Sequence, residues 1–238
     1  MVKEEMVQRS PIRIFEQSIH GGLKAGETGV IASLNGIGKT SVLVQIALDK
    51  LLQGKKVIHV SFTQHTHHVL SWYEDIFDEF TSKKNLENTK EVKNDLVKNR
   101  VLMNFNQDGM SIEQIIKSLR AMIVQGGFNA DAVIVDGLDF SRTNPPDIAN
   151  FKSFAAELGI SVWFSCSVKD EQYDKENIPV ILGKFTGFID VIIILQPKPE
   201  TPPHPAHVEL SISKDRDTVI SKSMAMKLDP KTLLILEA

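Results

Sequence analysis

The most informative stretch of this chain is Ser33-Leu34-Asn35-Gly36-Ile37-Gly38-Lys39-Thr40. A short apolar run precedes it and apolar residues at helical spacing follow it, which predicts a strand leading in and a helix leading out. The spacing matches the phosphate-binding pattern G-x-x-x-x-G-K-[ST], with Ser33 in place of the first glycine. We interpret the stretch as a phosphate-binding loop, because a chance glycine-rich turn would not need the adjacent Gly-Lys-Thr triplet.

The residue types in this loop suit phosphate chemistry. Gly36 and Gly38 let the backbone curl so that several N–H groups point inward, and the helix that follows adds its positive end. Lys39 is expected to reach the β- and γ-phosphates, and the Thr40 hydroxyl to ligate Mg²⁺. The residues predicted to bind a nucleotide are Asn35, Gly36, Ile37, Gly38, Lys39, Thr40 and Ser41.

A carboxylate partner for Thr40 is expected at the end of a neighbouring strand. The apolar run Val133-Ile134-Val135 ends in Asp136, which fits the Walker B pattern of a strand that delivers one carboxylate to the metal. Many strands end in Asp, so this signal gains its weight from the loop upstream. We predict that Thr40 and Asp136 form the metal site.

Strand and helix signals alternate along most of the chain. Strands are expected at 29–32, 57–62, 101–105, 132–135, 161–166 and 191–195, with helices between them at 38–52, up to 80, 111–125 and 144–158. Three later segments, 207–213, 224–228 and 232–236, read as antiparallel strands. The pattern predicts an α/β fold with a mainly parallel central sheet flanked by helices and a C-terminal antiparallel extension.

Composition points to one packed domain over residues 1–238. Hydrophobic residues make up 42% of the chain and charged residues 24%, which excludes disordered and low-complexity classes. The net charge of −3 offers no global attraction to DNA, and no segment resembles a targeting sequence or a membrane span. We therefore expect a cytoplasmic protein that does not enter membranes.

Three segments are expected to stand apart from the packed body. Residues 1–11 are predicted to be flexible, and residues 197–206 to form a stiff proline-rich connection. Residues 81–100 carry six basic and three acidic side chains, so they are predicted to be mobile. Their basic surface is either a solvated helix face or a nucleic-acid contact.

A further motif gives the chain a family resemblance. The lead-in Gly21-Gly22-Leu23-Lys24-Ala25-Gly26-Glu27, the loop, and the later Val135-Asp136-Gly137 together resemble the RecA-like P-loop ATPases, in the branch of KaiC, RadA and DnaB. The resemblance extends from about residue 12 to residue 236. It implies a RecA-like fold that binds ATP with Mg²⁺.

The segment around Lys214-Asp215-Arg216 resembles a motif of KaiC and RadA. In those proteins the Lys and Arg reach the nucleotide site of the neighbouring subunit and stabilise charge on the transferring phosphoryl group. The resemblance implies that Lys214 and Arg216 act in trans, and that the protein is a homo-oligomer stacked head to tail in a ring or filament. The alternative is a solvated strand end on a monomer.

Two positions depart from the family pattern. Relatives carry a glutamate after the second strand, where this chain has Thr63-Gln64, and a glutamine at a later strand tip, where Ser165-Cys166-Ser167 stands. Gln64 can orient a water but cannot accept its proton. Any ATPase activity is therefore expected to be weak, unless Glu74 or another acid supplies the base.

Smaller clusters are given plainer interpretations. The histidines His65, His67 and His68 are read as a polar helix start near the nucleotide, with a phosphate contact or a zinc site as alternatives. Trp72 belongs to an apolar helical stripe that we assign to packing or a subunit interface in preference to base stacking. Cys166 has no acid or histidine near it in the sequence, so it is not expected to act as a nucleophile.

The function predicted from the sequence is nucleotide-dependent assembly or regulation by an ATP- and Mg²⁺-binding protein with slow hydrolysis. Two alternatives remain open at this point. One is an active DNA-dependent ATPase of the helicase or recombinase type, and the other is an interaction module that keeps the fold but binds no nucleotide.

Overall fold

A nine-stranded sheet runs through the part of the chain that the computed structural model describes, residues 2–84, 86, 89–169, 172–200 and 206–237. The strands lie in the order β3-β2-β4-β5-β1-β6-β7-β8-β9. Those from β3 to β6 are mutually parallel, whereas β7, β8 and β9 are antiparallel. This confirms the predicted α/β class, with a mainly parallel sheet and an antiparallel C-terminal extension. The strand bounds are β1 Thr28–Ser33, β2 Val57–Ser61, β3 Arg100–Asn104, β4 Ala132–Asp136, β5 Ser161–Ser167, β6 Val191–Lys198, β7 His207–Asp215, β8 Thr218–Leu228 and β9 Ile235–Glu237.

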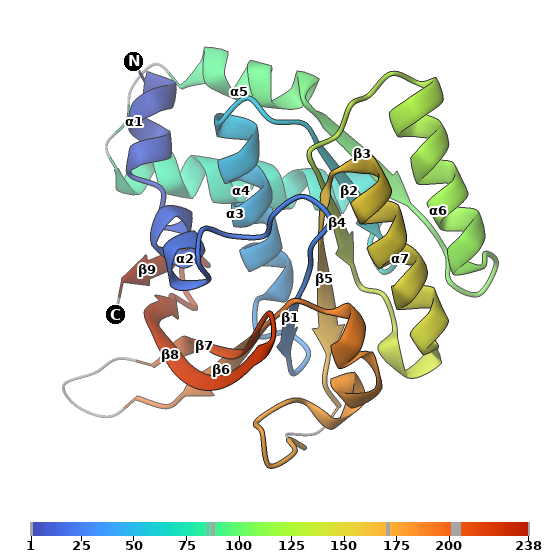
Figure 1. Cartoon of the computed structure of the whole chain (residues 1–238). Helices are drawn as coiled ribbons and strands as arrows, with labels where there is room; N and C mark the ends of the chain where they lie inside the picture. The colour runs from blue at the N-terminus through green and yellow to red at the C-terminus, as the bar shows by residue number, and fades with distance from the viewer. Residues whose placement is uncertain (1, 85, 87–88, 170–171, 201–205, 238) are drawn as a thin grey trace.

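Helices cover both faces of this sheet (Figure 1). One face carries α1 Val2–Gln8, α2 Ile12–Ser18, α3 Lys39–Leu52, α4 Thr66–Lys83 and α5 Lys90–Lys98. The other face carries α6 Ile112–Arg120, α7 Pro145–Leu158 and the 3-10 helix η3 Val180–Phe188. A π-helical turn, η1 Ala121–Gln125, prolongs α6, and a short 3-10 helix, η2 Phe140–Arg142, precedes α7. A capping box begins α6, since Gln114 N–H donates to Ser111 Oγ and Ser111 N–H to Gln114 Oε1.

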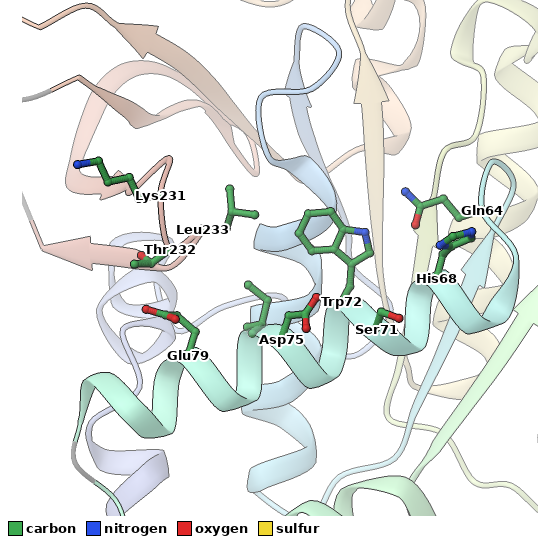
Figure 2. Close-up of a pocket in the computed structure, with 10 residues that line it drawn as sticks. Gln64, His68, Ser71, Trp72, Asp75, Glu79, Lys231, Thr232 and Leu233 are labelled. Carbon is green, nitrogen blue, oxygen red and sulfur yellow. The ribbon is translucent and has the colours of Figure 1, made fainter.

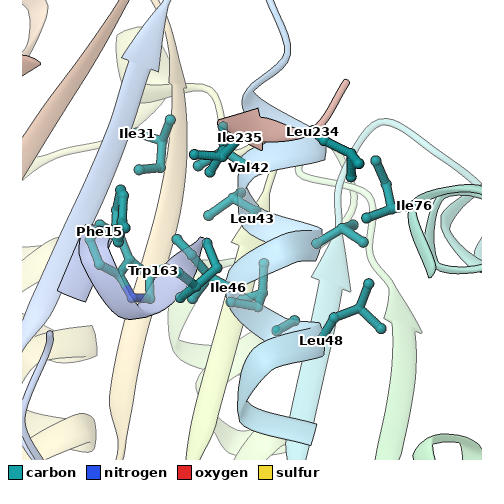
Figure 3. Packing of buried hydrophobic residues seen from close by; sticks show 14 of the residues in the cluster. Phe15, Ile31, Val42, Leu43, Ile46, Leu48, Ile76, Trp163, Leu234 and Ile235 are labelled. Atoms are coloured by element: carbon teal, nitrogen blue, oxygen red, sulfur yellow. The ribbon is translucent and has the colours of Figure 1, made fainter. Parts of the chain in front are cut away.

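The central strand β1 is buried along its whole length, as a parallel strand between two helical layers should be. Figure 3 shows the larger of the two cores, where Phe15 and Trp163 lie across from the apolar side of α3. Trp163 also explains Gly29, because a Cβ there would lie 2.5 Å from the indole ring. This packing holds β1, and therefore the loop that follows it, in a fixed position.

The ends of the parallel strands set the position of the site. Register pairs join Ser33 to Ser167 and Ser61 to Asp136, so β1, β2, β4 and β5 end at the same edge. Loops at the carboxyl ends of parallel strands are the usual ligand-binding edge of such sheets. The glycine-rich loop and Asp136 are therefore brought to one edge although about a hundred residues separate them.

Some segments differ from the sequence-based prediction. The start of the chain was expected to be flexible, yet Val2–Gln8 form α1 and Met6 is fully buried, because α1 packs against α3. Within 81–100, α5 buries Val92 and Leu96, while residues 85, 87 and 88 lie outside the described residues. The proline-rich connection begins later than expected, since β6 continues to Lys198, and residues 201–205 also lie outside the described part.

Strand β8 is longer than its sequence indicates. It begins at Thr218, whereas the sequence predicted a strand only from Met224. The first half, through Ser223, is mostly exposed, and its two apolar residues, Val219 and Ile220, are adjacent, so it has none of the alternation by which a strand is recognised. Pairing with β7, and not burial, makes this half a strand. Among the described residues, no helix is long and apolar enough to cross a membrane.

Candidate functional site

A cleft of about 590 Å³ opens at the carboxyl edge of the sheet, beside the glycine-rich loop. Its size is within the range of about 300–1,000 Å³ that is common for small-molecule sites. Loops after β1, β2, β4 and β5 all contribute side chains to it. Among the residues that line it are Lys39, Thr40, Gln64, Trp72, Asp136, Asp139, Ser165, Lys169 and Leu233.

The loop itself has the backbone conformation that its glycines permit. Gly36 has φ 79° and Gly38 has φ 114°, both in the left-handed region that other residues rarely adopt. At Gly38 there is also no room for a side chain, because a Cβ would lie 2.3 Å from Cδ2 of Leu228. The C-terminal extension therefore packs closely against the loop.

Lys39 lies at the floor of the cleft and is buried. Its Nζ donates to the carbonyl oxygen of Leu34 at 2.8 Å and to that of Ser33 at 3.2 Å. Burial lowers the pKa of this ammonium, and Asp136 is among the groups that oppose the shift. Among the described residues no carboxylate lies within ion-pair distance of it, so its charge is available to an anion in the cleft.

Asp136 is held from both sides by hydroxyl groups. Thr40 Oγ1 donates to its Oδ2 at 2.8 Å, and Ser165 Oγ donates to its Oδ1 at 2.6 Å. The N–H of Gly137 donates to Ser165 Oγ at 2.8 Å, which fixes that hydroxyl in turn. Thr40 and Asp136, paired in the sequence analysis, therefore lie side by side, and Ser165 positions the carboxylate.

Gln64 also lines the cleft, at the end of β2. Its backbone is fixed, since its N–H donates to Ser61 Oγ and Asn104 Nδ2 donates to its carbonyl oxygen. Its side-chain Oε1 is buried and has no hydrogen-bond partner among the described residues. Glu74, the alternative base, does not line the cleft but lies near Arg100.

A groove of about 590 Å³ continues from the cleft along α4 (Figure 2). Its opposite wall is the segment Lys231–Leu233, and Gln64, Trp72 and Leu233 line both the groove and the cleft. The segment is tied to α3, because Leu233 O accepts from Ser41 Oγ at 2.5 Å and from Gln45 Nε2 at 3.0 Å. The Ser41 side chain therefore points toward this segment, and Ile37 packs against the hydrophobic core. The other residues predicted to bind a nucleotide line the cleft.

Sequence reasoning missed several side chains that line the cleft, among them Trp72, Asp139 and Lys169. Asp139 follows Asp136 by three residues and caps η2, its Oδ1 accepting from Ser141 N–H. Lys169 lies just past the end of β5, and Trp72 lies on the side of α4 that faces the cleft. The signal for Asp139 and Lys169 was their place after parallel strands, whereas nothing in an apolar helical stripe distinguishes Trp72.

Lys214 and Arg216 lie at the opposite, amino edge of the sheet and do not line the cleft. Arg216 donates to Glu27 Oε2 at 2.7 Å, to Gly22 O at 2.7 Å and to Ile19 O at 2.8 Å. Lys214 Nζ donates to the carbonyl oxygen of Ile189. Both side chains line one hollow there. Arg216 does not continue the strand, because β7 ends at Asp215 and Arg216 lies in the following turn with φ 53°. Within this chain the two side chains bind the lead-in to β1 and the segment before β6.

The histidines and the cysteine take no part in the cleft. His65, His67 and His68 are exposed at the start of α4, and only His68 borders the groove. Among the described residues, no group of three or more His, Cys, Asp or Glu side chains is arranged to hold a metal. Cys166 is buried beneath the loop, and burial raises the pKa of its thiol to about 12, which keeps it protonated.

Neither protein-family models nor curated protein sequences match this chain.

Proposed function

We propose that this protein binds ATP together with Mg²⁺ as a RecA-like P-loop protein, and that it hydrolyses ATP slowly. One observation carries the proposal: a left-handed glycine loop places Lys39 and Thr40 beside Asp136, at the carboxyl edge of a parallel sheet. Inward-facing loop N–H groups, a lysine ammonium and a hydroxyl–carboxylate pair are the donors that a metal-bound polyphosphate requires.

The donor set at Thr40 and Asp136 fits Mg²⁺. This cation prefers oxygen ligands, and in nucleotide sites it takes one or two from the protein and the rest from phosphate and water. The hydroxyl and the carboxylate are 2.8 Å apart, and Ser165 keeps the carboxylate oriented. When bound, Mg²⁺ would neutralise part of the charge on the phosphates.

The groove offers a place for the rest of the nucleotide. With phosphates at the loop, the base would lie between the Trp72 indole and Leu233, which face each other across the junction of cleft and groove. An indole face supports base stacking, worth about 1–3 kcal/mol per base. This makes base stacking, the less favoured interpretation of Trp72 from the sequence, part of the proposal.

Slow hydrolysis is proposed from the side chains near the cleft. Its carboxylates among the described residues are Asp136, engaged by Thr40 and Ser165, and Asp139, engaged by Ser141. Gln64 Oε1 is unpartnered and would accept a hydrogen bond from a water, but an amide does not take up its proton. Retained binding with weakened turnover suits a regulatory or assembly role, in which occupancy of the site is the signal.

Nucleotide titration by calorimetry tests the proposal. Lys39→Ala should weaken Mg-ATP binding at least about 10-fold, since a hydrogen bond to a charged group contributes about 1.5–3 kcal/mol. Lys175→Ala is the matched control, because it removes the same charge from an exposed side chain outside the cleft. Equal affinity of the Lys39 variant and the unmodified protein would refute the proposed binding mode.

A further inference from the structure

The cleft contains a second cation that the phosphate-binding pattern does not account for. Lys169 lies two residues beyond the end of β5, and β5 lies between β1 and β4 in the sheet. Its position is therefore between the glycine-rich loop, which follows β1, and Asp136, which ends β4. Both Lys39 and Lys169 line the cleft, one at its floor and one at its rim.

The two lysines differ in their surroundings. Lys39 is buried and held by loop carbonyl oxygens, so its position is set before any ligand arrives. Lys169 is exposed, and among the described residues it has no hydrogen bond or ion pair. Its four-carbon stem leaves the ammonium free to move toward charge in the cleft.

The acids of the cleft give this second cation a task. Asp136 and Asp139 both line the cleft. Burial raises the pKa of the Asp139 carboxyl, but hydrogen bonds from Ser141 outweigh it and lower the pKa, and the nearby Lys169 charge lowers it further. Two carboxylates oppose the entry of a polyphosphate, and the opposition grows with each phosphate group. Even with Mg²⁺ bound, Lys39 and the metal do not balance both acids and the added charge of a third phosphate.

We propose that Lys169 contacts the terminal phosphate of the bound nucleotide from within the same chain, and so makes the site prefer nucleoside triphosphates to diphosphates. The inference rests on the proposed function, because it assumes that the phosphates lie along the glycine-rich loop. Lys169 acts as a specificity residue here: it distinguishes the number of phosphates and takes no part in proton transfer.

Calorimetric titrations of Lys169→Ala with a non-hydrolysable Mg-ATP analogue and with Mg-ADP test this inference. We expect the affinity for the triphosphate to fall about tenfold or more and the affinity for ADP to fall less than about threefold, so the ratio of the two changes. Lys169→Arg should restore most of the ratio, because it keeps the charge. Lys175→Ala should leave both affinities unchanged, because Lys175 is also exposed but lies outside the cleft.

The outcomes separate this inference from the proposed function. If Lys169→Ala leaves the ratio of triphosphate to diphosphate affinity unchanged while Lys39→Ala weakens both, the inference is wrong and the proposed function stands. If the unmodified protein binds neither nucleotide, both are wrong. Unfolding temperatures of the Lys169 and Lys175 variants should match that of the unmodified protein, since both replaced side chains are exposed.

Discussion

The two edges of the sheet carry cations in opposite situations. At the amino edge, Arg216 is bound by Glu27, Asp215 and two carbonyl oxygens, and Lys214 by a carbonyl oxygen. At the carboxyl edge, the partners of Lys39 within the described part of the chain are all neutral oxygens. A cation whose charge is compensated by its own chain stabilises the fold, whereas an uncompensated one at a cleft is available to a ligand.

This difference bears on self-association. For Arg216 to reach a neighbour's nucleotide, as the family resemblance implies, it must leave Glu27 and Asp215. The neighbour's phosphates would have to replace those contacts. Head-to-tail assembly strengthened by ATP thus stays a prediction, and the amino edge is where it can be tested against a purely structural role.

The largest effect is expected at the carboxyl edge, from Gly38→Ala. The new Cβ would lie 2.3 Å from Leu228 Cδ2, and the left-handed φ of 114° adds strain of about 1–3 kcal/mol. Because the loop N–H groups would be misaligned, Mg-ATP affinity should fall about 100-fold or more. Calorimetric titration measures the affinity, and chemical denaturation measures the free energy of unfolding.

Gly54→Ala is the control for this change. Gly54 also has a positive φ, of 80°, but none of the described residues other than its chain neighbours lies within 4 Å of its Cβ position, and it is outside the cleft. It should lose stability without losing affinity. Equal affinities of the two variants would mean that the loop conformation does not determine binding.

At the amino edge, Arg216→Ala should lower the free energy of unfolding by about 2–3 kcal/mol. The change leaves Glu27, which is largely buried, without its ion-pair partner. Affinity of the monomer for Mg-ATP should stay within about twofold, because the side chain is at the far edge from the cleft. Denaturation and titration of the same sample provide both values.

Light scattering of this variant with ATP, ADP and no nucleotide distinguishes the two roles. A normal unfolding temperature together with loss of ATP-dependent association would overturn the structural role and support action in trans. Lys222→Ala, on the exposed first half of β8, is the matched control for removing a positive charge near this edge.

The smallest of the three effects is expected from Gln64→Glu. A carboxylate at this position can accept the proton of a water that the amide only orients. The rate of ATP hydrolysis should therefore rise about tenfold, which is below the 10²–10⁴-fold range for general acid–base catalysis. Phosphate release measures it, with Thr63→Glu as the comparison at the neighbouring position. Fast hydrolysis by the unmodified protein would contradict the argument, since it would require another base.

Features that depend on local chemistry could be predicted from the sequence. Such features include the glycine-rich loop and the strand that ends in Asp136. They also include each strand and helix of the alternating pattern, because each is recognised from a few neighbouring residues. Their backbone conformations follow from glycine's freedom, from capping residues and from apolar periodicity. For the same reason the fold class and the position of the loop could be predicted before the structure was known.

Which distant residues share the cleft follows from how whole elements pack. The cleft receives Trp72 from a helix, Lys169 from a strand end and Leu233 from the C-terminal segment. They meet because the sheet order places β5 beside β1, and because Ser41 and Gln45 hold the last segment on α3. The amino-edge contacts of Arg216 are likewise long-range, joining residues about 190 apart. Such contacts leave no local periodicity in a sequence, because they follow from how whole elements pack.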